Sequence, residues 1–145
     1  MSKIFHFLYV SLVVLCLTSL AANAKNWDNI IDAAGMGEVE NIEIHLSKGG
    51  SVNHKDDDGE TPLMSAVSLG KLKNIKFLIA QKADVNARDN DGESVLVKTC
   101  CGRGNMSVAK LLISHGAVAS QEDVKLCRKL KKPYMAQYFT KNMKK

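Results

Sequence analysis

The stretch DGETPLMSAVSLGKLKNIKFLIAQKADVNARDN, residues 58–90, is followed directly by a second version of itself. That version, DGESVLVKTCCGRGNMSVAKLLISHGAVA, covers residues 91–119 and has one extra residue between Leu96 and Gly104. The glycines of the two Asp-Gly-Glu segments are 33 residues apart, and the same step backwards finds a third copy. Its aligned pairs are Asp28 with Thr61, Ile30 with Leu63, Ala33 with Ala66, Gly37 with Gly70, and Val52-Asn53 with Val85-Asn86. Self-similarity at a fixed period predicts a stack of structural repeats.

Each copy has the signals of two short helices joined by a turn. Thr61, Ser94 and Asp28 each precede a segment with apolar residues at helical spacing, so each side chain can accept a hydrogen bond from a helix start. Pro62 takes the first helical position, where its missing N–H costs nothing. The glycines expected to end these helices are Gly37, Gly70 and Gly104. Second helices are expected around Ile42, Ile44 and Leu46, around Ile75, Phe77, Leu78 and Ile79, and around Val108, Leu111, Leu112 and Ile113.

These residues closely resemble the ankyrin repeat family, which shares Asp-Gly-x-Thr-Pro-Leu, a later Ala and Gly, an Ile/Val-x-x-Leu-Leu run and a closing Gly-Ala-Asp-Val-Asn. The sequence departs from that pattern at Lys82, where the family prefers Gly, and at Val95 and Thr99 in the third copy. The resemblance implies a mainly α solenoid of helix-turn-helix units with hairpin fingers. The expected parts are repeats at about 26–56, 57–89 and 90–119, then a basic capping helix pair at 120–145.

The aspartates of DDDGETPLMSA, residues 56–66, allow two interpretations. A calcium loop needs an oxygen ligand five residues before its glycine, but His54 and Ala87 hold that place, and the distal Glu is missing. A tight turn is favoured instead, in which Gly has positive φ and Asp58 or Asp91 bonds the backbone ahead of it. We therefore expect neither a metal nor a cofactor here.

The N-terminal 24 residues, MSKIFHFLYVSLVVLCLTSLAANA, have the form of an export signal. One Lys precedes an apolar run that ends on Ala22-Asn23-Ala24, the small-x-small pattern of a cleavage site. We expect cleavage after Ala24 and a periplasmic or secreted chain starting at Lys25. An uncleaved anchor is less favoured because polar residues dilute the run, and the bulky Leu15 disfavours lipid modification of Cys16.

Charge is unevenly distributed along the remaining chain. Residues 125–145 hold eight Lys or Arg and no acid, whereas residues 25–124 hold eleven basic and fifteen acidic residues. The aromatic, basic tail allows weak contact with an anionic membrane surface, although the favoured role is to cover the end of the stack. The apolar residues of this tail, taken as residues 124–145, are Val124, Leu126, Cys127, Leu130, Tyr134, Tyr138 and Phe139. Nucleic acid is disfavoured because the body is acidic and an exported protein seldom meets it.

Three cysteines follow the signal: Cys100, Cys101 and Cys127. Cys100 aligns with a small, usually Ala-occupied position, so we expect a buried apolar filler. Stacked helix axes lie about 8–10 Å apart, whereas bridged Cα atoms lie about 4.4–6.8 Å apart, so only cysteines on directly facing sides could join. We therefore expect most molecules to lack a Cys100–Cys127 bridge. Paired C-x-x-C zinc ligands are absent, and the lone His115 is a weak substitute.

Catalytic patterns are missing from the sequence. His45, His54 and His115 are scattered, and we find no phosphate-binding glycine loop, nucleophile elbow or paired carboxylates. We therefore expect no enzyme and no catalytic residue.

A binding module is the remaining prediction, and the resemblance implies the same. Ankyrin repeats typically recognise proteins through fingertips and first-helix surfaces along a concave face, and four layers would give a face of roughly 30 Å. For any single residue of that face, plain solvated surface is the alternative. The candidates are His54, Lys55, Asp56, Asp57, Met64, Ser65, Ser68, Arg88, Asp89, Asn90, Val97, Lys98 and Cys101. A monomer is expected.

Overall fold

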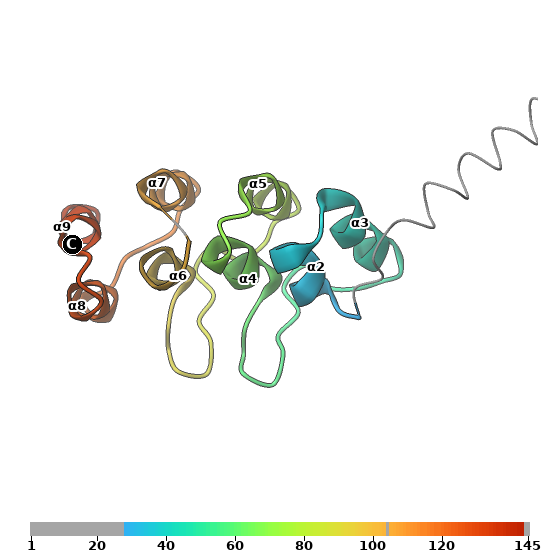
Figure 1. Ribbon diagram of the computed structural model, residues 1–145, viewed down its shortest axis with the longest axis horizontal. Helices are drawn as coiled ribbons and strands as arrows, with labels where there is room; N and C mark the ends of the chain where they lie inside the picture. Colours follow the sequence, from blue (N-terminus) through green and yellow to red (C-terminus); the bar gives the residue numbers. More distant parts are fainter. Residues whose placement is uncertain (1–27, 104, 144–145) are drawn as a thin grey trace, which may run out of the picture.

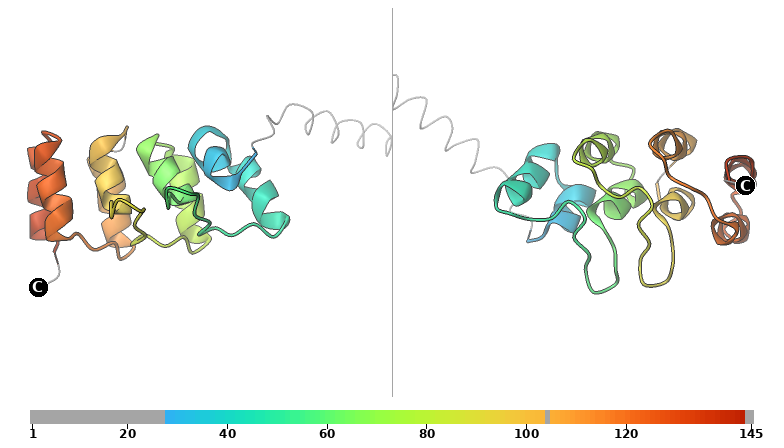
Figure 2. Two further views of the ribbon diagram at one scale, coloured as in Figure 1. Left: turned by 90° about the horizontal axis from the view of Figure 1, so that it is seen from below. Right: turned by 180° about the vertical axis from the view of Figure 1, so that it is seen from behind.

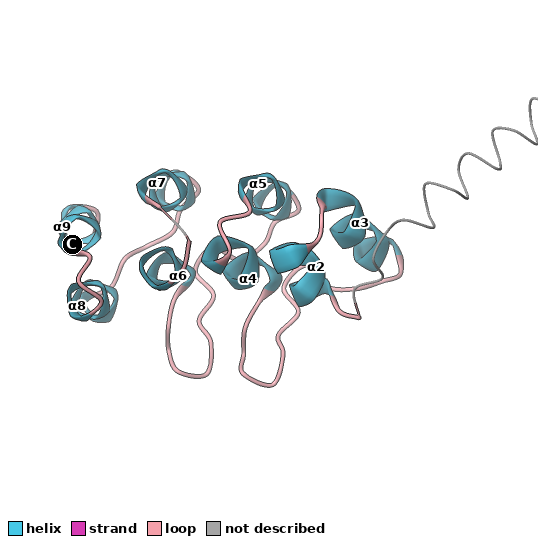
Figure 3. Cartoon of the chain, in the orientation of Figure 1, coloured by secondary structure: helices cyan, strands magenta, loops and turns pink. Residues whose placement is uncertain are grey.

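The computed structural model describes residues 28–103 and 105–143, and its regular secondary structure there is helical (Figure 3). The helices are α2 (Ile30–Met36), α3 (Val39–Ser47), α4 (Pro62–Ser68), α5 (Leu72–Ala80), α6 (Val95–Cys101), α7 (Met106–Ser114), α8 (Gln121–Lys129) and α9 (Pro133–Lys141). The first helices of the units, α2, α4, α6 and α8, form one row, and the second helices form the other (Figure 1). The expected mainly α repeat solenoid is confirmed. The export signal lies outside the described residues.

The layers stand side by side, and each first helix packs on the next (Figure 2). Small side chains make this close approach feasible, because Ala33, Ala34 and Ala66 are fully buried. Gly35 packs against Ser65 of α4, whose Oγ would clash with a Cβ added at that glycine. Asn74 of α5 also extends across to the first unit. Its buried side-chain amide donates to the carbonyls of Ala34 in α2 and of Gly37, the C-cap, and thereby satisfies the end of that helix.

Side-chain caps begin the first helices. Thr61 and Ser94 accept hydrogen bonds from the amides three residues ahead, as expected. In the first unit the cap is Asn29, which accepts from the amide of Asp32 at 2.8 Å, so the expectation of Asp28 is wrong. The buried Ile30 still aligns with Leu63, so the helix starts one residue later while its core register is kept.

The end of α6 also differs from expectation. The helix ends at Gly102, whose amide donates to the carbonyl of Lys98, whereas Gly104 lies outside the described residues. A Cβ at Gly102 would collide with the backbone carbonyl of Ser68 in α4. The extra residue of the third copy therefore lies after Gly102. This position has to be glycine because the neighbouring unit leaves no room for a side chain.

Lys82 adopts the left-handed conformation that the family gives to Gly. Its φ is 67°, and the equivalent positions Gly49 and Gly116 have φ of 88° and 94°. The amides of Lys82 and Ala83 donate back to the last turn of α5, as in the other units. The hydrogen-bonded turn therefore persists without glycine, at the cost of an unfavourable backbone conformation for Lys.

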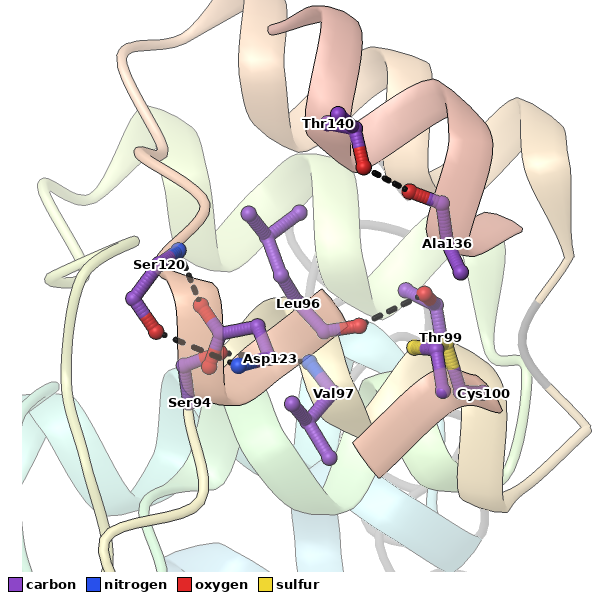
Figure 4. The surroundings of a disulfide bond; sticks show 10 residues. Ser94, Leu96, Val97, Thr99, Cys100, Ser120, Asp123, Ala136 and Thr140 are labelled. Atoms are coloured by element: carbon purple, nitrogen blue, oxygen red, sulfur yellow. Dashed lines mark hydrogen bonds between the residues drawn. A yellow bond between two sulfur atoms is a disulfide. The ribbon is translucent and has the colours of Figure 1, made fainter. Parts of the chain in front are cut away.

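A disulfide joins Cys100 of α6 to Cys127 of α8, so the expectation that most molecules lack this bridge is wrong (Figure 4). The two residues lie on directly facing sides of adjacent first helices, with Cα atoms 5.7 Å apart. That is well within the range that a disulfide spans. Both residues are buried, whereas Cys101 is exposed and free.

No helix among the described residues is both long enough and apolar enough to span a bilayer.

Candidate partner-binding surface

Two long fingers extend from the first-helix row in the same direction (Figure 1). We call residues 54–60 finger 1 and residues 87–93 finger 2. Gly59 and Gly92 lie in their turns with φ of 77° and 78°, which confirms the predicted positive-φ positions. At the base of finger 2, Arg88 forms an isolated antiparallel bridge with Ser94, the residue that follows the finger.

Asp56 and Asp89 hold these turns, so the expectation that Asp58 and Asp91 would do so is wrong. The Oδ1 atom of Asp56 accepts from the amides two and four residues ahead, at 3.1 and 2.7 Å. Asp89 repeats this arrangement at 3.1 and 2.8 Å. An aspartate two residues earlier can point into the turn, which leaves Asp58 and Asp91 exposed.

Hydrogen bonds tie the two fingers together. Lys55 Nζ donates to the carbonyl of Arg88 at 2.7 Å. The side-chain amide of Asn90 donates to the carbonyl of Asp57 at 2.8 Å, and its backbone amide donates to that of Asp58 at 2.9 Å. Three candidate binding residues, Lys55, Arg88 and Asn90, therefore take part in the structure of the face itself.

A buried carboxylate anchors finger 2 to the cap. Asp123 of α8 is 1% exposed and accepts from Ser94 Oγ at 3.0 Å and from the amide of Ser120 at 2.8 Å (Figure 4). Arg88 Nη1 lies 3.2 Å from Asp123 and 2.7 Å from the carbonyl of Gly92. The buried charge is therefore both paired and hydrogen-bonded, as burial requires.

Lys98 forms a second ion-pair cluster beneath finger 2. Its Nζ lies 2.6 Å from Asp89 and 2.9 Å from Glu93. Burial acts to lower the pKa of Lys98, but the hydrogen bonds to Asp89 and Glu93 outweigh it and raise that pKa. Burial likewise acts to raise the pKa of Asp89, but the bond from Lys98 and two backbone amides hold it below its usual value. Lys98 and Asp89 therefore both stay charged at neutral pH.

Two neighbouring groups have raised pKa values. Burial raises the pKa of Glu60, and nearby carboxylates reinforce this against the opposing charge of Lys98. Burial also raises the pKa of the Cys101 thiol, helped by Glu93. A higher pKa keeps more of that thiol protonated and therefore less reactive.

Met64 and Val97 are 0% and 1% exposed, so their expected place on the binding surface is wrong. Met64 is part of the apolar core between the layers. Val97 lies among the residues that line a groove beside α8. The other first-helix candidates, Ser65, Ser68 and Cys101, are at least partly accessible. On finger 1, His54 and Asp57 are exposed.

The family model for ankyrin repeats matches residues 30–123 in three copies. The chain belongs to the ankyrin repeat family. That membership, predicted from the sequence, is confirmed. A search of curated proteins finds no match. Ankyrin repeats are general protein–protein interaction modules and are typically non-enzymatic.

Among the described residues, no third long finger follows fingers 1 and 2 in the connection between α7 and α8. Fourteen residues separate α3 from α4 and α5 from α6, but only six separate α7 from α8. A groove of about 570 Å³ lies between finger 2 and α8, in the neighbourhood where a further finger would begin. Arg88, Asp91, Glu122, Lys125 and Lys129 are among its lining residues. The shortened connection at residues 115–120 was the available sequence signal for this groove.

No group of three or more His, Cys, Asp or Glu side chains among residues 28–103 and 105–143 is arranged to hold a metal ion. The finger carboxylates of Asp56 and Asp89 instead accept hydrogen bonds from their own turns.

Proposed function

We propose that this ankyrin domain binds a protein partner through the tips of its two fingers and the adjoining first-helix surface. The observation that carries the proposal is the network that joins the fingers through Lys55 and Asn90. Long loops normally lose conformational freedom on binding, and that loss weakens affinity. Because these fingers are already tied together, a partner would meet a preorganised face.

The chemistry of the tips favours a basic region on the partner. Asp57, Asp58 and Asp91 are exposed there, whereas Lys55 is hydrogen-bonded to the neighbouring finger. Complementary charge speeds the encounter of two proteins and fixes their orientation. We therefore propose that the partner presents Lys or Arg side chains to the tips and an adjoining segment to the groove beside finger 2.

Export belongs to the same proposal. The Ala22-Asn23-Ala24 ending supports cleavage before Lys25, and the partner would then be met in the periplasm or outside the cell. We expect the domain to bind as a monomer and without enzymatic activity of its own.

The test removes tip charge without touching the finger network. Asp57→Ala/Asp91→Ala is the test variant, and Glu40→Ala/Glu43→Ala, which removes two exposed carboxylates of α3, is the matched control. A partner would first be captured by crosslinking in the native compartment and then purified for titration. We expect at least a tenfold weaker Kd for the test variant, about 1.4 kcal/mol, and little change for the control.

Stability measurements keep the result interpretable. Both variants change exposed positions, so each should unfold within about 0.5 kcal/mol of the parent. Replacing Lys55, Arg88 or Asn90 would be a poorer test, because their bonds hold the fingers in place. Equal affinity of the test variant and the parent would refute the fingertip proposal.

A further inference from the structure

The end of the stack opposite the first unit carries a concentrated positive charge. Residues 125–145 contain eight Lys or Arg and no Asp or Glu. Lys129, Lys131 and Lys132 are exposed in or next to the turn between α8 and α9, and none forms an ion pair with another described residue. The cationic groups at this turn are therefore available to an external anion.

Two apolar side chains flank the same lysines. Tyr134 is 81% exposed and Leu130 is 37% exposed, whereas Phe139 on the same helix is fully buried. The inward residues of α9 thus cover the end of the stack, as the sequence predicted, while Tyr134 has no such role. We call residues 129–134 the basic turn.

The basic turn has a defined backbone. The amides of Lys131 and Lys132 donate to the carbonyls of Arg128 and Cys127 at 3.0 and 2.9 Å. Cys127 is itself joined to α6 by the disulfide, and Pro133 begins α9 directly after the lysines. The turn is therefore held on the third repeat, in the last helix pair at the end of the stack (Figure 2). Its lysines and Tyr134 are exposed there.

We propose that the basic turn docks this protein on an anionic lipid surface. Lysines near such a surface are attracted to it electrostatically. A tyrosine prefers the headgroup level, where its ring is removed from water and its hydroxyl stays hydrated. The lysines alone would be complementary to an acidic protein. The exposed Tyr134 and Leu130 beside the lysines are complementary to the boundary between lipid headgroups and acyl chains, which favours a lipid surface. The basic turn does not include the fingertips, but its first residue, Lys129, also lines the groove beside finger 2.

Vesicle sedimentation tests the charge. The full chain is mixed with vesicles of phosphatidylcholine alone, or of phosphatidylcholine and phosphatidylglycerol in equal parts, at low and high salt. The test variant is Lys129→Gln/Lys131→Gln/Lys132→Gln, and the matched control is Lys48→Gln/Lys73→Gln/Lys76→Gln, which removes three exposed lysines elsewhere. Residues 1–24 are common to all variants, so any lipid binding that they cause is shared.

We expect the parent and the control to bind the anionic vesicles, with binding that weakens at high salt. At about fivefold per lysine, the test variant should partition roughly 100-fold less. Equal losses in test and control would overturn the proposal, because net charge rather than the basic turn would then be responsible. Salt-insensitive binding, or the absence of any preference for anionic vesicles, would overturn it as well.

Fluorescence tests the insertion and separates lipid from an acidic protein. In a Trp27→Phe background, which removes the only tryptophan, Tyr134→Trp should show a blue-shifted emission with anionic vesicles. Soluble polyglutamate serves as the acidic polypeptide control. If polyglutamate produced an equal shift, or if anionic vesicles produced none, docking on lipid would be refuted.

Discussion

Removing the Cys100–Cys127 disulfide should cost this protein a large part of its stability. The bridge joins residues 27 apart in the sequence, and a cross-link of that span lowers the entropy of the unfolded chain by about 12 cal/mol/K. At 25 °C this corresponds to about 3.5 kcal/mol. Because small domains are stable by only about 5–15 kcal/mol, the midpoint of thermal unfolding should fall by about 10–15 °C.

Three samples separate the cross-link from the packing of the sulfur atoms. They are the parent, the parent held in a reductant, and Cys100→Ala/Cys127→Ala, each unfolded in guanidinium chloride and followed by circular dichroism. Reduction leaves the side chains in place, so the cross-link account predicts that both altered samples lose about 3.5 kcal/mol. Cys101→Ala is the control, since that exposed thiol is outside the bridge, and it should change stability by about 0.5 kcal/mol or less.

The cap should be the first region to loosen. α8 packs on α6 next to the bridge, while α9 makes fewer contacts with α7. Hydrogen exchange should therefore accelerate in α8 and α9 before it accelerates in α4 and α5. A reduced parent that loses less than about 1 kcal/mol, beside a double variant that loses far more, would refute the cross-link reasoning and assign the effect to core packing.

Three further outcomes are expected. Lys82→Gly should stabilise the protein by about 0.5–1 kcal/mol in urea unfolding, because Lys82 has a φ of 67°, whereas Gln81→Gly at a φ of −79° should destabilise it. Lys98 and backbone amides hold the pKa of Asp89 below 3.8, so the ionised Asp89 should stabilise the fold above that pH. This stabilisation should be lost as the pH falls through the pKa of Asp89 in the folded state. The unfolding free energy of Asp89→Asn should therefore depend less on pH in this acid range. N-terminal sequencing of the exported protein should start at Lys25, and retention of Met1 would contradict the export prediction.

The repeat architecture could be predicted because its determinants are local and recur. Thr61 and Ser94 cap helices with their own side chains, and Gly59 and Gly92 supply the positive φ of their turns. Such preferences act within a few residues, and the 33-residue period repeats them. The prediction of a helix cap was wrong where two neighbouring residues could both accept the capping hydrogen bond, as with Asp28 and Asn29 at the start of α2.

The binding surface was harder to predict because a residue's position in the repeat does not determine its exposure. Met64 and Val97 lie on first helices, yet the next layers bury them completely or nearly so. Lys55 and Asn90 lie on fingers, yet they bond the other finger. Burial and pairing of this kind depend on how adjacent repeats pack against one another. An alignment of one repeat sequence with the next does not give this packing.

The sequence by itself determined the solenoid, its helix pairs and its two turns, since capping, helical periodicity and positive φ are properties of short segments. Tertiary structure decided the rest. Only packing brought Cys100 to face Cys127, placed the buried carboxylate of Asp123 against Arg88, and left Tyr134 exposed beside unpaired lysines. The physical reason is that these contacts join residues of different layers, so they depend on the distance and rotation between stacked units and not on the preference of any one segment.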